Sequence, residues 1–119
     1  MSILIVFIPM LPPGLNQTYK TGKGNFYKSS EAKEWQAQAA LLIGAEAGHQ
    51  NWVDDSKFYE VELTIQNSRH DTDAFIKLVI DTLAQKLGFD DKRIKKITSE
   101  KIVSKEKGIT IRLTHYGEK

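Results

Sequence analysis

The fold of this chain is decided by residues 58–91, which read FYEVELTIQNSRHDTDAFIKLVIDTLAQKLGFDD. Residues 58–67 alternate apolar and polar side chains, which is the period of a strand that buries one face. From Ile76 the apolar residues recur at helical spacing until Gly88, a residue typical of helix C-termini. A half-buried strand followed by an amphipathic helix indicates an α/β or α+β domain.

The flanking segments predict the rest of this domain. Residues 1–8 are apolar, rich in β-branched side chains and soon followed by proline, so we expect a buried first strand. A second helix is expected from Glu31, and residues 94–113 predict a final β-hairpin. We therefore expect a single domain over residues 1–119, with a mixed sheet of about four strands packed against two main helices. The stripe of the second helix that we expect to face the core consists of Trp35, Ala39, Leu42 and Ile43.

Composition excludes several classes of protein. The chain has 119 residues, no cysteine and 27% charged residues, which fits one globular domain and excludes a disordered chain or a disulfide scaffold. The formal charge of +2 divides into +3 for residues 1–30, −7 for residues 31–91 and +6 for residues 92–119. The first apolar run is too short to span a bilayer and has no preceding basic region, so we expect a cytoplasmic protein.

Aspartates gather around the start and end of the helix within residues 58–91. Asp71 and Asp73 are two residues apart between the strand and the helix, where both side chains can converge. Asp90 or Asp91 adds a third carboxylate only if the tertiary fold returns it to that point. Such hard oxygen ligands favour Mg²⁺ or Mn²⁺. Lys77 follows one helical turn after Asp73, where its ammonium group could meet a phosphate.

Each of these features also has a purely structural interpretation. Asp73 alone can cap the helix, Lys77 and Asp81 can form an exposed ion pair, and the Asp90-Asp91 dipeptide is typical of a turn. Asp54-Asp55 is expected to be a solvated loop. A calcium-binding EF-hand loop and a zinc site both fit poorly, because the required glycine and the histidine spacing are absent.

The same residues resemble a known family. Residues 69–77, with the downstream Asp81-Thr82-Leu83 and Gly88-Phe89-Asp90-Asp91, resemble the RusA family of Holliday junction resolvases and its D-x-D-N-x-x-K signature. The N-terminal strand, the Pro12-Pro13-Gly14-Leu15-Asn16 loop and the lysine-rich C-terminal region are also similar to that family. Two residues depart from its pattern, because Ala74 stands in place of the usual asparagine and His70 in place of a common arginine.

The resemblance implies an endonuclease that binds four-way DNA junctions as a homodimer and makes paired, symmetric nicks with Mg²⁺, in DNA recombination and repair. It implies that Asp71, Asp73 and Asp91 are metal ligands and that Lys77 is a catalytic lysine, with Asp90 and Asp81 in supporting roles. The metal would activate water and stabilise the leaving 3′ oxygen, while Lys77 would neutralise charge in the transition state. The residues expected to contact DNA are Asn16, Lys20, Lys23, Lys28, Arg69, His70, Lys92, Arg93, Lys95 and Lys96.

Two other interpretations stay open on the sequence alone. One is a related metal-dependent nuclease that acts on forks, flaps or ordinary duplex DNA. The other is a non-catalytic nucleic-acid-binding module in which the aspartates only cap and turn the chain.

Overall fold

The computed structural model describes residues 3–12, 19–22, 25–28, 30–68 and 73–117. Of residues 19–22, 25–28 and 73–75 it describes the backbone only. Its centre is a four-stranded sheet in the order β1-β6-β4-β5. The strands of this sheet are β1 (Leu4–Ile8), β4 (Tyr59–Gln66), β5 (Ile94–Ile102) and β6 (Gly108–His115).

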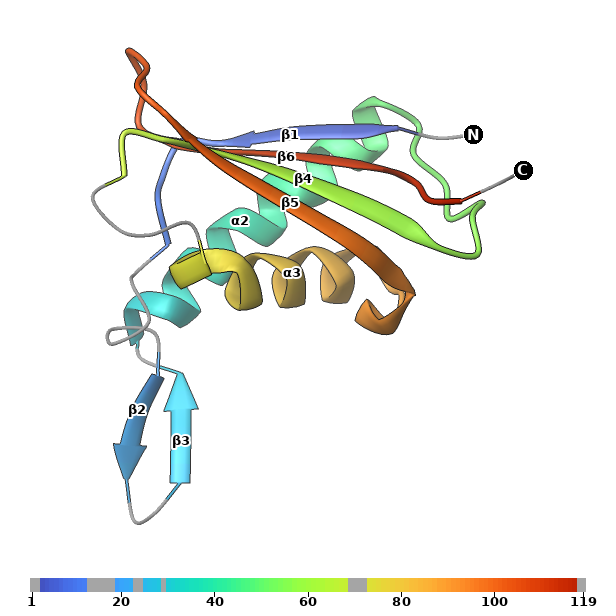
Figure 1. The fold of residues 1–119 in the computed structure, drawn as a ribbon. Helices are drawn as coiled ribbons and strands as arrows, with labels where there is room; N and C mark the ends of the chain where they lie inside the picture. Colours follow the sequence, from blue (N-terminus) through green and yellow to red (C-terminus); the bar gives the residue numbers. More distant parts are fainter. Residues whose placement is uncertain (1–2, 13–18, 23–24, 29, 69–72, 118–119) are drawn as a thin grey trace.

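Two helices lie on one side of this sheet and leave its other side open (Figure 1). They are α2 (Ser30–His49) and α3 (Asp73–Leu87). Strand β4 runs parallel to β5, whereas the β1–β6 and β6–β4 pairs are antiparallel. The structure therefore confirms the predicted mixed sheet of four strands with two main helices in an α+β fold.

Strand β4 has the alternation that its sequence predicts. Tyr59, Val61, Leu63 and Ile65 are buried, and the residues between them are only half-buried. Strand β1 also buries one face, but as an edge strand it leaves Ile5 49% exposed. The expectation of a buried first strand thus holds for only one of its two faces.

The helices pack through the predicted stripes. Trp35, Ala39 and Ile43 of α2 are buried, and the Trp35 indole donates a hydrogen bond to the carbonyl oxygen of Met10 at 3.1 Å. Gln36 of α2 donates to the hydroxyl of Thr82 in α3 at 2.8 Å, which joins the two helices. The helices and the sheet thus share one apolar core.

The predicted β-hairpin of residues 94–113 is wrong. Strands β5 and β6 do not pair with each other, because they lie on opposite sides of β4. The chain passes from β4 through α3 into β5, and a crossover of this kind brings the second strand back parallel to the first. Residues 103–107 then cross the end of β4, where the Asn67 side chain accepts a hydrogen bond from Ser104 N and donates to Glu106 O.

A second, two-stranded sheet was not predicted. Strands β2 (Tyr19–Gly22) and β3 (Asn25–Lys28) pair antiparallel in the segment that carries Lys20 and Lys28 of the predicted DNA-binding set. Their hairpin extends away from the main sheet at the end of the molecule where α2 begins (Figure 1). Strands of only four residues that mix polar and aromatic side chains give little periodic signal, which explains the missed assignment.

Candidate metal and DNA-binding site

The predicted metal site falls partly outside the described residues. Asp71, Arg69 and His70 are outside them, and so are Asn16 and Lys23 of the predicted DNA-binding set. Asp73 is the first residue of α3, and only its backbone is described. Lys20 lies on β2 and Lys28 on β3, again by their backbones.

Lys77 and Asp81 form an ion pair along α3. The Lys77 ammonium lies 3.5 Å from an Asp81 carboxylate oxygen, and the lysine side chain is 67% exposed against 20% for the aspartate. A pair this exposed adds only a few tenths of a kcal/mol to helix stability. The pairing leaves the charge of the exposed Lys77 ammonium open to a ligand.

The two aspartates of the Asp90-Asp91 pair have different roles. Asp90 is the N-cap of a short 3₁₀ helix, η1 (Asp91–Arg93), and its carboxylate accepts a hydrogen bond from the Lys92 N–H at 2.9 Å. Asp91 is exposed, and its side chain forms no hydrogen bond or ion pair with any other described residue. Asp91 is thus the open carboxylate of the pair.

A rigid cluster holds η1 in place. Gly88, at φ +83°, ends α3, and the next residue, Phe89, is buried against Tyr59 with ring centroids 4.9 Å apart. Arg93 forms a two-pronged ion pair with Asp54 at 2.6 and 2.8 Å, and its guanidinium also lies over the Tyr59 ring. The position of Asp91 therefore depends on packing rather than on a free loop.

Hydrogen bonds and burial in this cluster shift the pKa values of Asp54 and Tyr59. The hydrogen bond from Arg93, followed by that from Tyr59, lowers the pKa of Asp54 below its usual range. Burial, followed by the hydrogen bond to Asp54, raises the pKa of Tyr59 to about 12. Asp54 lies in an exposed loop, as expected, but its carboxylate also pairs with Arg93 and accepts a hydrogen bond from the Tyr59 hydroxyl.

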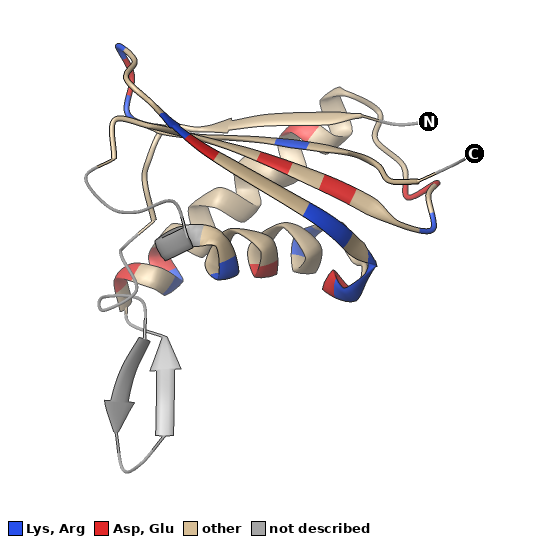
Figure 2. Cartoon of the chain, in the orientation of Figure 1, with Lys and Arg blue, Asp and Glu red and all other residues tan. Residues whose placement is uncertain are grey.

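The basic residues near η1 differ in whether their side chains already interact with other groups of the chain. The Arg93 guanidinium is engaged by Asp54 and by the carbonyl oxygen of Lys57, and Lys96 pairs with Glu60 at 3.8 Å. Lys92 is exposed within η1, and Figure 2 shows basic residues in η1 and at the start of β5. Lys95 lies over the Phe58 ring at 4.7 Å.

Lys57 was missed by sequence reasoning. Its ammonium lies 5.5 Å from the centroid of the same Phe58 ring that Lys95 approaches at 4.7 Å. The adjacent Lys57-Phe58 dipeptide was the available signal, because basic residues interleaved with aromatics are typical of nucleic-acid contacts.

The helix separates the two parts of the predicted metal site. α3 has 15 residues, which at about 1.5 Å per residue gives a length of about 22 Å. Asp73 begins this helix, and Asp91 follows its opposite end. Among the described side chains, which do not include those of Asp71 and Asp73, no group of three His, Cys, Asp or Glu could hold a metal ion.

Comparison with protein families gives one decisive match. The family described as Endodeoxyribonuclease RusA matches residues 9–114, a range that contains every predicted metal, catalytic and DNA-binding residue. The chain belongs to the RusA family. It is thereby a structure-specific endonuclease of Holliday junctions.

Other comparisons add nothing to the RusA assignment. No curated protein matches the chain. Among solved structures, a 2C-methyl-D-erythritol 2,4-cyclodiphosphate synthase from Plasmodium vivax is 10% identical with a TM-score of 0.38, covering 98% of this chain and 99% of that one. A Plasmodium falciparum IspF in complex with CDP is also 10% identical, with a TM-score of 0.34, covering 94% and 93%. Likeness at this level supports no argument about function.

No helix among the described residues of this RusA family member is long and apolar enough to cross a membrane.

Proposed function

We propose that this protein resolves Holliday junctions in DNA recombination and repair by paired, symmetric nicks, as a homodimer that uses Mg²⁺ or Mn²⁺. The RusA family match over residues 9–114 carries this proposal, because the matched range includes Asp71, Asp73, Lys77 and Asp91. The cytoplasm is the proposed location.

The residues present fit a divalent cation. Asp71, Asp73 and Asp91 would supply carboxylate oxygens, the ligands that Mg²⁺ and Mn²⁺ prefer. Asp90 is occupied in capping η1, whereas Asp91 is exposed and its carboxylate forms no hydrogen bond or ion pair with another described residue. When bound, the metal would supply the positive charge that lowers the pKa of water and stabilises the leaving oxygen.

Lys77 would act on the scissile phosphate. Its ammonium is exposed, lies one helical turn from Asp73, and is held along α3 by Asp81. A cation in this position stabilises the negative charge that develops on the phosphate oxygens.

A second copy of the chain would account for the separation of the predicted metal ligands along α3. Carboxylates that belong to opposite ends of a helix about 22 Å long cannot share one cation, whose ligands all lie within about 2 Å of it. We infer that Asp71 and Asp73 of one copy meet Asp91 of the other. A twofold dimer then has two equivalent sites, as two symmetric nicks require.

The test is cleavage of matched junction, fork and linear duplex substrates with Mg²⁺. We expect the wild type to cut the junction in preference to the other two, and Asp73→Asn to bind the junction but lose at least about a hundredfold in cleavage rate. Glu34→Gln, a carboxylate-to-amide change on exposed α2 surface, is the matched control and should cleave normally. Equal cutting of duplex would favour a general nuclease, and full activity of Asp73→Asn would refute the site.

A further inference from the structure

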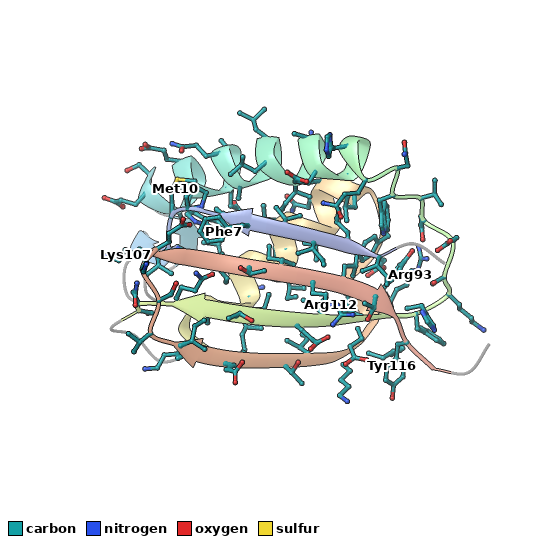
Figure 3. The ribbon with its side chains drawn as sticks, turned by 90° about the horizontal axis from the view of Figure 1, so that it is seen from above. Phe7, Met10, Arg93, Lys107, Arg112 and Tyr116 are labelled. Carbon is teal, nitrogen blue, oxygen red and sulfur yellow. The ribbon has the colours of Figure 1, made fainter. Side chains whose placement is uncertain are left out.

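The outer edge of β5 is open along its length. β5 has nine residues and is the last strand of the sheet. The opposite edge strand, β1, is shorter, and the Gln50 amide covers it by accepting a hydrogen bond from Ile5 N and donating to Ile5 O. No described side chain forms a comparable hydrogen bond to the backbone of β5, and no described element lies beyond this strand in Figure 3. A long open edge is a template for pairing with another strand.

We propose that β5 pairs antiparallel with β5 of a second copy of this chain, with the twofold axis at Thr98. The two sheets then join into one continuous sheet across the dimer. This inference rests on the proposed function, which requires a homodimer, and it names the surface that forms it.

The charges on β5 select this register. Lys96, Thr98 and Glu100 lie on the same face of the strand, because they pair with alternate residues of β4. A twofold axis perpendicular to the sheet keeps each residue on its own face, so residues of one face oppose each other. With the axis at Thr98, Lys96 stands opposite the partner's Glu100, and symmetry repeats this pair.

Neighbouring registers lack this match. A shift of the axis to Ile97 places Lys96 opposite the partner's Thr98, and a shift to Ser99 places it opposite the partner's Ile102. Opposite charges directly across an antiparallel pair stabilise it, and Lys95 is the extra residue of the bulge between the first two β4 pairs, outside the regular ladder. The charge pattern therefore fits one antiparallel register.

An apolar residue on the other face of β5 is incompletely covered. Ile97 points toward the side of the sheet that carries the helices, yet it remains 40% exposed. In the proposed register it lies diagonal to the partner's Ile97, within reach across the axis. Pairing thus buries apolar surface that the chain's own helices leave open.

The same arrangement would bring the two parts of the predicted metal site, from different copies of the chain, to one end of the shared sheet. β5 runs from η1 toward Ile102, which pairs with the last residue of β4, Gln66, and α3 runs in the opposite direction (Figure 1). Antiparallel pairing therefore sets the start of α3 beside the partner's η1. Asp73 and the partner's Asp91 then lie at the same end of the shared sheet.

Disulfide trapping tests the axis directly. The chain has no cysteine, so Thr98→Cys introduces a single thiol. Opposed residues in an antiparallel pair have Cα atoms about 4.5–5.5 Å apart, within the range that a disulfide spans. We expect Thr98→Cys to form a covalent dimer under mild oxidation and Ile5→Cys, an exposed position on the other edge strand, to stay monomeric under the same denaturing analysis.

Charge exchange supplies a second measurement. Lys96→Glu should weaken dimerisation about tenfold or more in sedimentation equilibrium, and adding Glu100→Lys should restore it. Arg112→Glu, which breaks a comparable 3.7 Å ion pair with Glu62 away from this edge, is the matched control and should leave the dimer intact.

The outcomes separate the interface from the function. Wild-type cleavage of junctions with Mg²⁺, together with a Thr98→Cys chain that does not crosslink and a Lys96→Glu chain that dimerises normally, would overturn the β5 interface and leave the proposed function standing. A crosslinked β5 dimer in a wild type that cleaves no junction would support the interface and overturn the function.

Discussion

Subunit mixing gives the sharpest prediction about the divided site. Asp73 begins α3 and Asp91 follows its other end, about 22 Å away, whereas the oxygens around one Mg²⁺ lie within about 4 Å of each other. Chains carrying Asp73→Asn and chains carrying Asp91→Asn should therefore each form inactive homodimers. In a mixed dimer, one site combines the intact Asp71-Asp73 pair of one copy with the intact Asp91 of the other.

The size of the recovery follows from this geometry. Random mixing of equal amounts makes about half of the dimers mixed, and each mixed dimer has one intact site out of two, so about a quarter of the wild-type sites return. The assay is Mg²⁺-dependent cleavage of a labelled junction after the two chains, carrying different tags, are unfolded and refolded together. A mixed dimer should nick one strand without the symmetric second cut.

A matched control uses two changes on the same side of the site. Asp71→Asn mixed with Asp73→Asn should show no recovery, because in each mixed site one of these two ligands is missing. The absence of recovery in the Asp73→Asn and Asp91→Asn mixture, with mixed dimers verified by both tags, would refute the divided site.

Three further predictions concern the scaffold and DNA binding. Because the pKa of Tyr59 is raised to about 12, the unfolded chain loses this proton at a lower pH than the folded chain. The free energy of unfolding should therefore fall by up to about 2–3 kcal/mol between pH 10 and 12. Denaturant titrations should show this fall in the wild type and a smaller fall in Tyr59→Phe. Gly108→Ala should cost about 1–3 kcal/mol, because φ is +156° and a Cβ would collide with the Ile8 carbonyl oxygen, whereas Gly48→Ala, which has open space in α2, should be neutral or stabilising in the same titration. Lys95→Ala should lower the slope of junction affinity against salt by about 1 if this lysine neutralises one DNA phosphate, measured by titrating binding at several salt concentrations.

The central strand and both helices could be predicted because their signals are local. The alternation that ends at Gln66 and the helical spacing from Ile76 to Gly88 each lie within one element, and burial follows directly from such periods. The buried stripe of α2 that includes Trp35 is likewise a periodic pattern within one element. Predicting these elements required no knowledge of the tertiary fold.

Strand partners could not be predicted in this way. β5 and β6 are neighbours in sequence with turn-forming residues between them, which locally favours a hairpin. What separates them is the crossover through α3, which returns β5 to the free side of β4 and leaves β6 to pair on the other side. The Asn67 side chain then fixes the connection, through contacts with Ser104 and Glu106 that lie 37 and 39 residues away in sequence.

In the candidate site, too, local features could be predicted from the sequence and long-range contacts could not. The aspartates and Lys77 could be selected from residue type and spacing, but sequence could not assign separate roles to Asp90 and Asp91. That assignment depends on η1, whose first N–H groups need a cap that Asp90 provides. It also depends on Asp54, whose pairing with Arg93 spans 39 residues.

The distribution of paired and free charges indicates where DNA should approach. On the open face of the sheet, Arg112 pairs with Glu62 and Lys96 with Glu60, so these cations are already partly neutralised (Figure 3). The exposed Lys92 and the Lys95 ammonium over Phe58 lie instead at the corner that holds Asp91.

The basic hairpin β2–β3 lies at the other end of the chain's own α3, near its start (Figure 1). Antiparallel pairing through β5 would set this end of one copy beside the lysine corner of the other. The two basic segments of the sequence would then come from different copies and border the same carboxylates. Phosphates held on both sides of those carboxylates would place the scissile bond at the metal, which neither segment of a single chain could do alone.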